Sequence, residues 1–355
     1  MGRTSTRALI WRSRLADWWA NVWRWVLMAG GAVAAVYIVL DQGVANAPMM
    51  GIAVGALVVG WALGAAGYAR LALSLLVATA CVLAGITIVH GVFQYAQGNF
   101  SPVYVTWPFG MHKNFLGTTM AFAAVVAYVS PDWVGWTRGW SRAAFGLLIV
   151  AILLTQSRQA LIGLMFAVVV VVIRRRTTGR SRLVLLLLIP AGVLIATMIS
   201  DQIASQNQFN SVFQRVDWFR EVFRYWRESP VFGHGLRYWY VDPTVPYQPP
   251  QAELEVLATT GVLGLIGFAV MWIGILVVLW RVDPRFGTLA VAVLLSRIIQ
   301  AQFDLFWIAA GVSVPFVIAG ICLGAMAYEQ RDTALERPIA TGLGRRRVPV
   351  GGFRG

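Results

Sequence analysis

Long, continuous runs of apolar residues, separated by short polar segments, make up most of this chain. Several runs approach or exceed the roughly 20 residues that a helix needs to cross the hydrocarbon core of a bilayer. The runs do not alternate between apolar and polar positions, so helices are favoured over the strands of a membrane barrel. We predict ten membrane-spanning helices, at about 23–40, 49–67, 71–92, 114–130, 143–156, 158–173, 183–200, 254–280, 287–303 and 306–328.

One polar interval is too long to be a turn between two such helices. The expected fold is therefore an all-α polytopic membrane protein with a large outward loop. Its parts, in chain order, are a basic amino end (1–22), seven helices (23–200), the outward loop (201–253), three helices (254–329) and a basic tail (330–355).

The composition agrees with a membrane protein. The 355 residues are 58% hydrophobic and 12% charged, with a mean hydropathy of +0.68, which excludes a soluble globular domain. The net charge is +14, but the basic residues lie mostly in short segments between apolar runs, so nucleic-acid binding is not expected. Cys81 and Cys322 both lie inside apolar runs, and neither a disulfide nor a metal site is expected.

The placement of the basic residues predicts the orientation. With the amino end in the cytoplasm, 21 of the 29 basic residues fall in cytoplasmic segments, as the positive-inside rule requires. Both ends of the chain are then cytoplasmic, and the loop 201–253 faces outward. Eight basic residues on the outer half defy the rule and need another explanation: Lys113, Arg158, Arg215, Arg220, Arg224, Arg227, Arg237 and Arg297.

Within the outward loop, residues 211–229 are expected to form an amphipathic helix on the membrane surface. An apolar stripe, expected to face lipid or other helices, runs along it: Val212, Val216, Phe219, Phe223 and Trp226. Beside the stripe lies a basic ridge of Arg220, Arg224 and Arg227. Guanidinium groups bind phosphate oxygens in pairs and keep their charge, so the ridge is a candidate for binding a lipid-linked phosphate. Lipid headgroups and carboxylates of the same helix are the alternative partners.

Three further features carry possible chemistry. The turn after this helix contains Gly-His-Gly, in which His234 is a candidate acid or base. Trp239 and Tyr240 follow, and their rings suit either the face of a sugar or the membrane interface. Within the predicted ninth helix, Arg297 is either a functional cation or the partner of Asp304 or Glu253 in a structural ion pair.

Taken together, several short motifs resemble the O-antigen ligase/polymerase superfamily. The motifs, from the end of the chain backwards, are Phe303-Asp304, the helix start Leu254-Glu-Val-Leu-Ala-Thr-Thr-Gly-Val-Leu-Gly264, the turn Pro230-Val-Phe-Gly-His-Gly235, the pair Arg215 and Trp218, the turn Thr155-Gln-Ser-Arg-Gln-Ala160, and Asn114 in His112-Lys-Asn-Phe-Leu116. Each motif alone is weak, but their order and their agreement with the predicted topology are specific. The resemblance covers about residues 110 to 325.

The resemblance implies a GT-C-like membrane glycosyltransferase that needs no metal or other cofactor. Such enzymes take a glycan from an undecaprenyl-pyrophosphate carrier on the outer face of the bacterial cytoplasmic membrane and pass it, with inversion, to another glycan or a lipid. By position, Arg158 and Arg215 match the family arginines that hold the pyrophosphate. Additional candidates are Arg220, Arg224 and Arg297 for the pyrophosphate, and Trp239, Tyr240 and Asn114 for the sugar or acceptor.

The chain departs from the family pattern at one functional place. The ligases carry a His-Asn pair just before the Leu254 helix start, where this chain has Pro250 and Gln251. Glu253 and Glu255 lie at the same helix start, and either carboxylate is a candidate to take the proton from a sugar hydroxyl. A carboxylate at a helix amino terminus is also stabilising without any catalytic role.

The expected function is therefore glycan transfer, by a polymerase or a ligase, from a polyprenyl-pyrophosphate-linked glycan to a glycan or lipid acceptor, in contact with membrane lipids. Two other functions stay open. One is a transporter or flippase of an anionic solute or lipid-linked glycan, against which the lack of a recognisable internal repeat argues mildly. The other is an inactive binding protein of the same fold.

Overall fold

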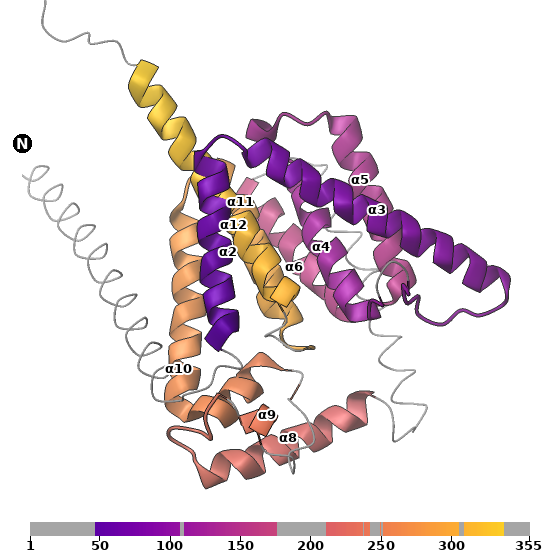
Figure 1. The fold of residues 1–355 in the computed structure, drawn as a ribbon, viewed down its shortest axis with the longest axis vertical. Coiled ribbons are helices and arrows are strands. Elements are labelled where there is room, and N and C mark those ends of the chain that lie inside the picture. The colour runs from indigo at the N-terminus through magenta and orange to yellow at the C-terminus, as the bar shows by residue number, and fades with distance from the viewer. Residues whose placement is uncertain are drawn as a thin grey trace, which may run out of the picture.

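The computed structural model describes residues 47–106, 110–175, 211–236, 238–241, 249, 251–304 and 309–336, and the elements within them are helical. Figure 1 shows the arrangement. The helices are α2 (Ala47–Ala65), α3 (Ala69–Ala96), α4 (Lys113–Val129), the short 3-10 helix η1 (Asp132–Val134), α5 (Arg138–Thr155), α6 (Arg158–Arg175), α8 (Ser211–Glu228), α9 (Tyr238–Val241), α10 (Ala252–Arg281), α11 (Pro284–Gln300) and α12 (Ala309–Glu336).

Helices occur at eight of the ten predicted membrane spans, and the spans predicted at 23–40 and 183–200 lie outside the described residues. Four described helices contain segments long and apolar enough to cross a membrane: Ala69–Ala96, Arg138–Thr155, Ala252–Arg281 and Gly311–Thr333. Their outer faces expose large apolar side chains, as lipid contact requires. The chain is therefore a helical membrane protein, and the count of ten spans stays a prediction.

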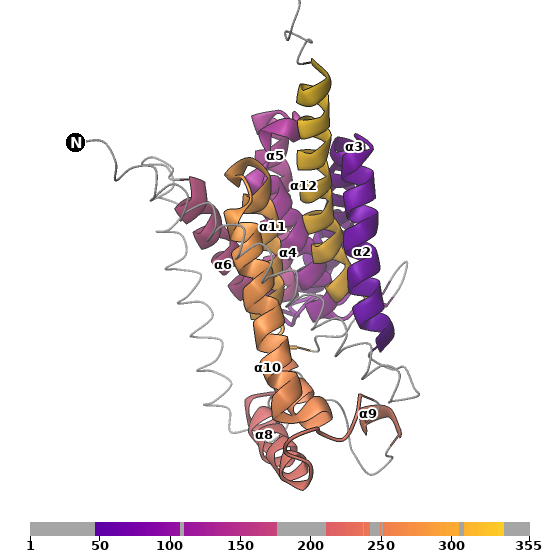
Figure 2. The same cartoon turned by 90° about the vertical axis from the view of Figure 1, so that its left-hand side faces the viewer.

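Small residues bring α2 and α12 into backbone contact. A Cβ atom on Gly64 would lie 2.8 Å from the Cα atom of Gly324, and one on Gly320 would overlap the carbonyl oxygen of Leu57. Paired small residues spaced four apart allow this close approach between membrane helices, because packing and not water exclusion drives their association. The two helices lie side by side in Figures 1 and 2.

The bundle has two ends of different character (Figures 1 and 2). At one end, here called the α8 end, lie α8, the start of α10, the end of α11 and the turn between α5 and α6. At the opposite end Arg174 donates hydrogen bonds to the carbonyls of Leu279, Trp280 and Val282, and so caps the last turn of α10. Arg285 pairs with Glu329 at this same end (2.9 Å).

α10 is broken near its first third, at Gly261. This residue has φ +65° and ψ −165°, which is not a helical conformation. The turn of residues 230–235 fills the break with backbone hydrogen bonds. The His234 and Gly235 amides donate to the carbonyls of Ala258 and Thr259, and the amides of Val262 and Leu263 donate to the carbonyls of Pro230 and Val231. The turn therefore satisfies the backbone groups that the break would leave unpaired inside the protein.

α8 packs across this broken helix through a small apolar cluster. Its members are Val222, Tyr225, Trp239, Leu254 and Ala258. The predicted bounds of α8 are confirmed to within one residue, but the buried side chains do not belong to the predicted apolar stripe. Phe219 and Phe223 of that stripe are 40% and 41% exposed, so they are available to lipid and not committed to the protein core.

Candidate functional site

Two cationic side chains meet where α4 and α6 begin. Lys113 is the first residue of α4 and Arg158 the first of α6, and the positive charge of Arg158 acts directly on the Lys113 ammonium. Both side chains are half-buried. The helix dipole adds positive potential at each amino terminus. Two positive charges therefore lie near each other at this corner of the α8 end.

The predicted tight turn between α5 and α6 is confirmed and places Arg158. α5 ends at Thr155, Gln156 adopts the left-handed conformation (φ +51°), and α6 begins at Arg158. Gly117 of α4 lets this turn come close, because a Cβ atom there would lie 2.6 Å from the Cβ atom of Ser157. The Ser157 hydroxyl is completely buried and has no hydrogen-bond partner among the described residues.

A chain of polar side chains ties these helix starts to the end of α11. Gln159 Nε2 donates to Asp304 Oδ2 (2.6 Å) and also approaches Thr118 Oγ1 on α4 (3.4 Å). Gln159 is almost fully buried. A buried amide held between three helices fixes their relative position, because each of its lost hydrogen bonds would be costly.

A second polar cluster joins the start of α10 to the end of α11. Gln302 Nε2 donates to Glu253 Oε1 (2.6 Å), and Gln251 Nε2 approaches Gln302 Oε1 (3.4 Å). The Ala252 amide donates to the Ala301 carbonyl (3.0 Å), which holds the two helix ends together. Glu253 Oε2 is buried and has no hydrogen-bond partner among the described residues. One carboxylate oxygen is thus positioned by an amide, while the other is buried without a hydrogen-bond partner among the described residues.

Arg297 lies inside the bundle, only 2% exposed, with its charge balanced by Asp304 and Glu255. The glycine at 311 makes room for it, since a Cβ atom there would lie 3.3 Å from the guanidinium carbon. Asp304, one of the two partners expected from the sequence, is near enough for its charge to act on Arg297. The second acidic neighbour of Arg297 is Glu255, which is fully buried, in place of the Glu253 considered from the sequence.

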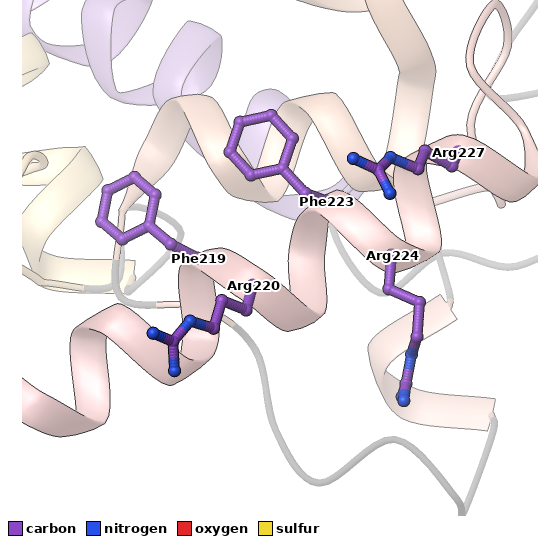
Figure 3. Close-up of a pocket in the computed structure, with 5 residues that line it drawn as sticks. All are labelled: Phe219, Arg220, Phe223, Arg224 and Arg227. Carbon is purple, nitrogen blue, oxygen red and sulfur yellow. The ribbon is translucent and has the colours of Figure 1, made fainter.

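The basic ridge of α8 is exposed and borders a surface hollow. Arg220, Arg224 and Arg227 line it together with Phe219 and Phe223 (Figure 3). In Figure 3 the two phenyl rings lie on the same side of α8, while Arg224 extends to the other side.

The two described contacts of this ridge are both local. Arg220 pairs with Asp217 (3.3 Å), while Arg224 donates to the Tyr225 hydroxyl (3.2 Å), and this hydrogen bond raises the pKa of Arg224. Arg215 lies in the first half of α8, and its side chain is outside the described part of the structure.

Three other predicted site residues have packing or capping contacts. His234 contacts the Tyr225 carbonyl oxygen through Nε2 (2.7 Å) and stacks on Tyr238. Trp239 is buried against Tyr225 and Tyr238. The backbone N–H of Asn114 donates to His112 Nδ1 (3.3 Å), so the His112 side chain caps α4. The catalytic role of His234 and the sugar or acceptor contacts of Trp239 and Asn114 stay predictions, and the side chain of Tyr240 is outside the described residues.

At the α8 end, Glu255 of α10 lies near Arg297 of α11, while Glu253 and the neighbour of Arg158, Gln159, are each bound to the end of α11. Arg220 and Arg224 lie on the surface of α8. Sequence reasoning missed Gln159 and the pairing role of Gln302. Each is a polar residue beside or within an apolar run, a pattern that predicts a buried polar side chain but does not identify its hydrogen-bond partner. Among the described residues there is no group of three acidic, histidine or cysteine side chains that could hold a metal ion.

Comparison with known families matches the part of the chain that contains most of these residues. Residues 143–269 match the family model described as O-antigen ligase, a span that includes Arg158, all of α8, the turn 230–235 and the start of α10. No curated protein matches the chain. The motifs at Arg158, at the Gly-His-Gly turn and at the start of α10 lie within the matched span, and this match supports membership of the O-antigen ligase/polymerase superfamily.

Proposed function

We propose that this protein transfers a glycan from a polyprenyl-pyrophosphate carrier to a hydroxyl group of a glycan or lipid acceptor, at the outer face of a bacterial cytoplasmic membrane. The family match supports glycan transfer in general. The observation that supports this site is that the starts of α6 and α10 are both tied to the end of α11, by Gln159 bound to Asp304 and by Gln302 bound to Glu253. The cations Lys113 and Arg158 and the carboxylate of Glu253 therefore lie at the same end of the bundle. In such a transfer, the cations would stabilise the leaving pyrophosphate and the carboxylate would accept the proton of the acceptor hydroxyl.

The cations act on the leaving group. When the bond between the anomeric carbon and the phosphate oxygen breaks, its electron pair stays on the phosphate, and negative charge grows there. Fixed positive groups in a partly buried site stabilise that charge without having to reorient. The turn before Arg158 fixes this residue at the start of α6, which supports such a role. The family resemblance and the charge pattern supply the further candidates Arg215, Arg220, Arg224 and Arg297.

Glu253 acts on the acceptor. The acceptor oxygen attacks the anomeric carbon from the face opposite the pyrophosphate, and its proton passes to a free oxygen of the Glu253 carboxylate. Glu253 Oε1 is held by Gln302, and Oε2 is unpartnered among the described residues. Glu255 is less suited, because it is completely buried and its charge interacts with Arg297.

This assignment offers an answer to the missing His-Asn pair. Where the ligases carry that pair, this chain has Pro250 and Gln251, and Gln251 approaches Gln302, the same amide that holds Glu253. A carboxylate two or three residues farther along the chain thus replaces an imidazole as the proton acceptor. The amides of Gln251 and Gln302 would set its position.

Purified protein in liposomes, supplied with a polyprenyl-pyrophosphate glycan and an acceptor glycan, tests the proposal. We expect release of the carrier pyrophosphate together with a longer or transferred glycan, and we expect Arg158→Ala to reduce both at least about tenfold, because charged hydrogen bonds contribute about 1.5–3 kcal/mol. Movement of intact donor across the bilayer, with neither product, would show a flippase instead.

A further inference from the structure

Lys113 is the single lysine among 29 basic residues, and its surroundings are unfavourable for a cation. It is half-buried, it lies at the positive end of the α4 dipole, and it lies within the field of Arg158. Among the described residues, no carboxylate forms an ion pair with it. Like charges placed together in a partly desolvated site repel each other. Such an arrangement costs stability in the empty protein.

The surrounding contacts hold this pair of cations together. Gly117 packs on Ser157, and Gln159 bridges toward Thr118, so that the starts of α4 and α6 are fixed side by side. The buried, unpartnered Ser157 hydroxyl lies between them. The two helix starts that carry Lys113 and Arg158 are therefore held next to each other by the packing of α4 against α6.

We propose that Lys113 is a second phosphate-binding cation, which together with Arg158 takes the two phosphate groups of the donor. This deepens the proposed function and rests on it for the identity of the donor. A diphosphate carries more than one negative charge, and an ammonium beside a guanidinium offers two separate sites for its oxygens. Lys113 lies outside the span matched to the O-antigen ligase model.

Binding of undecaprenyl pyrophosphate and of undecaprenyl phosphate to the full chain, in nanodiscs of neutral lipid, tests this proposal. Lys113→Ala should weaken binding of the pyrophosphate about tenfold, and that of the monophosphate much less, because only the pyrophosphate needs both cations. Lys113→Arg should keep most of the affinity. Arg138→Ala is the matched control, since Arg138 is an exposed first residue of α5 at the opposite end of the bundle.

Thermal stability separates a binding role from a structural one. Removing one of two repelling charges should leave the melting temperature of the empty protein unchanged or raise it, whereas loss of a structural contact would lower it. Equal affinity of Lys113→Ala and the unaltered protein for the pyrophosphate would overturn the inference, and so would equal losses for both lipids. If the pyrophosphate binds through Lys113 but no glycan is transferred in liposomes, the inference stands and the proposed function fails.

Discussion

Gly261→Ala is expected to prevent the protein from reaching its native fold, or to destabilise it by about 3 kcal/mol or more, since its backbone conformation is accessible almost only to glycine. Gly261 has φ +65° and ψ −165°. A Cβ atom there would overlap the carbonyl group of Val231 and lie 2.7 Å from the Phe232 amide nitrogen. The alanine would have to expel the 230–235 turn from the break in α10, and four backbone hydrogen bonds would be lost with it.

The measurement is the yield of monodisperse protein in detergent and its melting temperature. Gly267→Ala is the matched control, because Gly267 lies in the same helix and a Cβ atom there would have no neighbour within 4 Å. The yield and the melting temperature of the control should equal or exceed those of the unaltered protein, since alanine favours a helix more than glycine does. Normal yield and melting temperature for Gly261→Ala would show that the break and its docked turn do not matter for folding.

Glu253→Gln is expected to lower the rate of transfer about 10²- to 10⁴-fold, the usual contribution of a positioned general base. Glutamine keeps the size of the side chain and a hydrogen-bonding oxygen, so the packing beside Gln302 should survive. The group that accepts the proton is lost. Turnover measured at saturating donor and acceptor, with the melting temperature of the same sample, checks this expectation.

Glu228→Gln serves as the control for the change in charge, because Glu228 is an exposed carboxylate at the end of α8. Its rate of transfer should not change. Glu253→Asp should keep part of the activity, since it keeps the carboxylate but draws it back from the acceptor. A Glu253→Gln protein with normal melting temperature and normal turnover would remove Glu253 from the reaction and leave the choice of base open.

Patterns that depend on neighbours in the sequence could be predicted for this protein. The helix bounds at α8 and the turn at Thr155–Arg158 follow from local periodicity and from residues that break helices. The face that α8 buries did not follow, because Phe219 and Phe223 form a good stripe but the residues that pack on α10 are Val222 and Tyr225. Periodicity shows that a helix has an apolar side and does not show which partner covers it.

Contacts between residues far apart in the chain could not be predicted from the sequence. Gln159 and Asp304 are 145 positions apart, and neither has a spacing signal that points to the other. The Gly-His-Gly turn and the helix start Leu254–Gly264, which contains Gly261, are separate motifs in the sequence. Their physical connection, a turn that supplies the hydrogen bonds of a broken helix, depends on tertiary structure alone.

The most direct test of the site is a cryo-electron microscopy structure of the full chain in nanodiscs with a polyprenyl-pyrophosphate glycan bound. We predict density for the two phosphates at the α8 end, in contact with Arg158 and Lys113, and the first sugar beside Glu253. Density for the phosphates at the opposite end of the bundle, near Arg174 and Arg285, would contradict the proposed site.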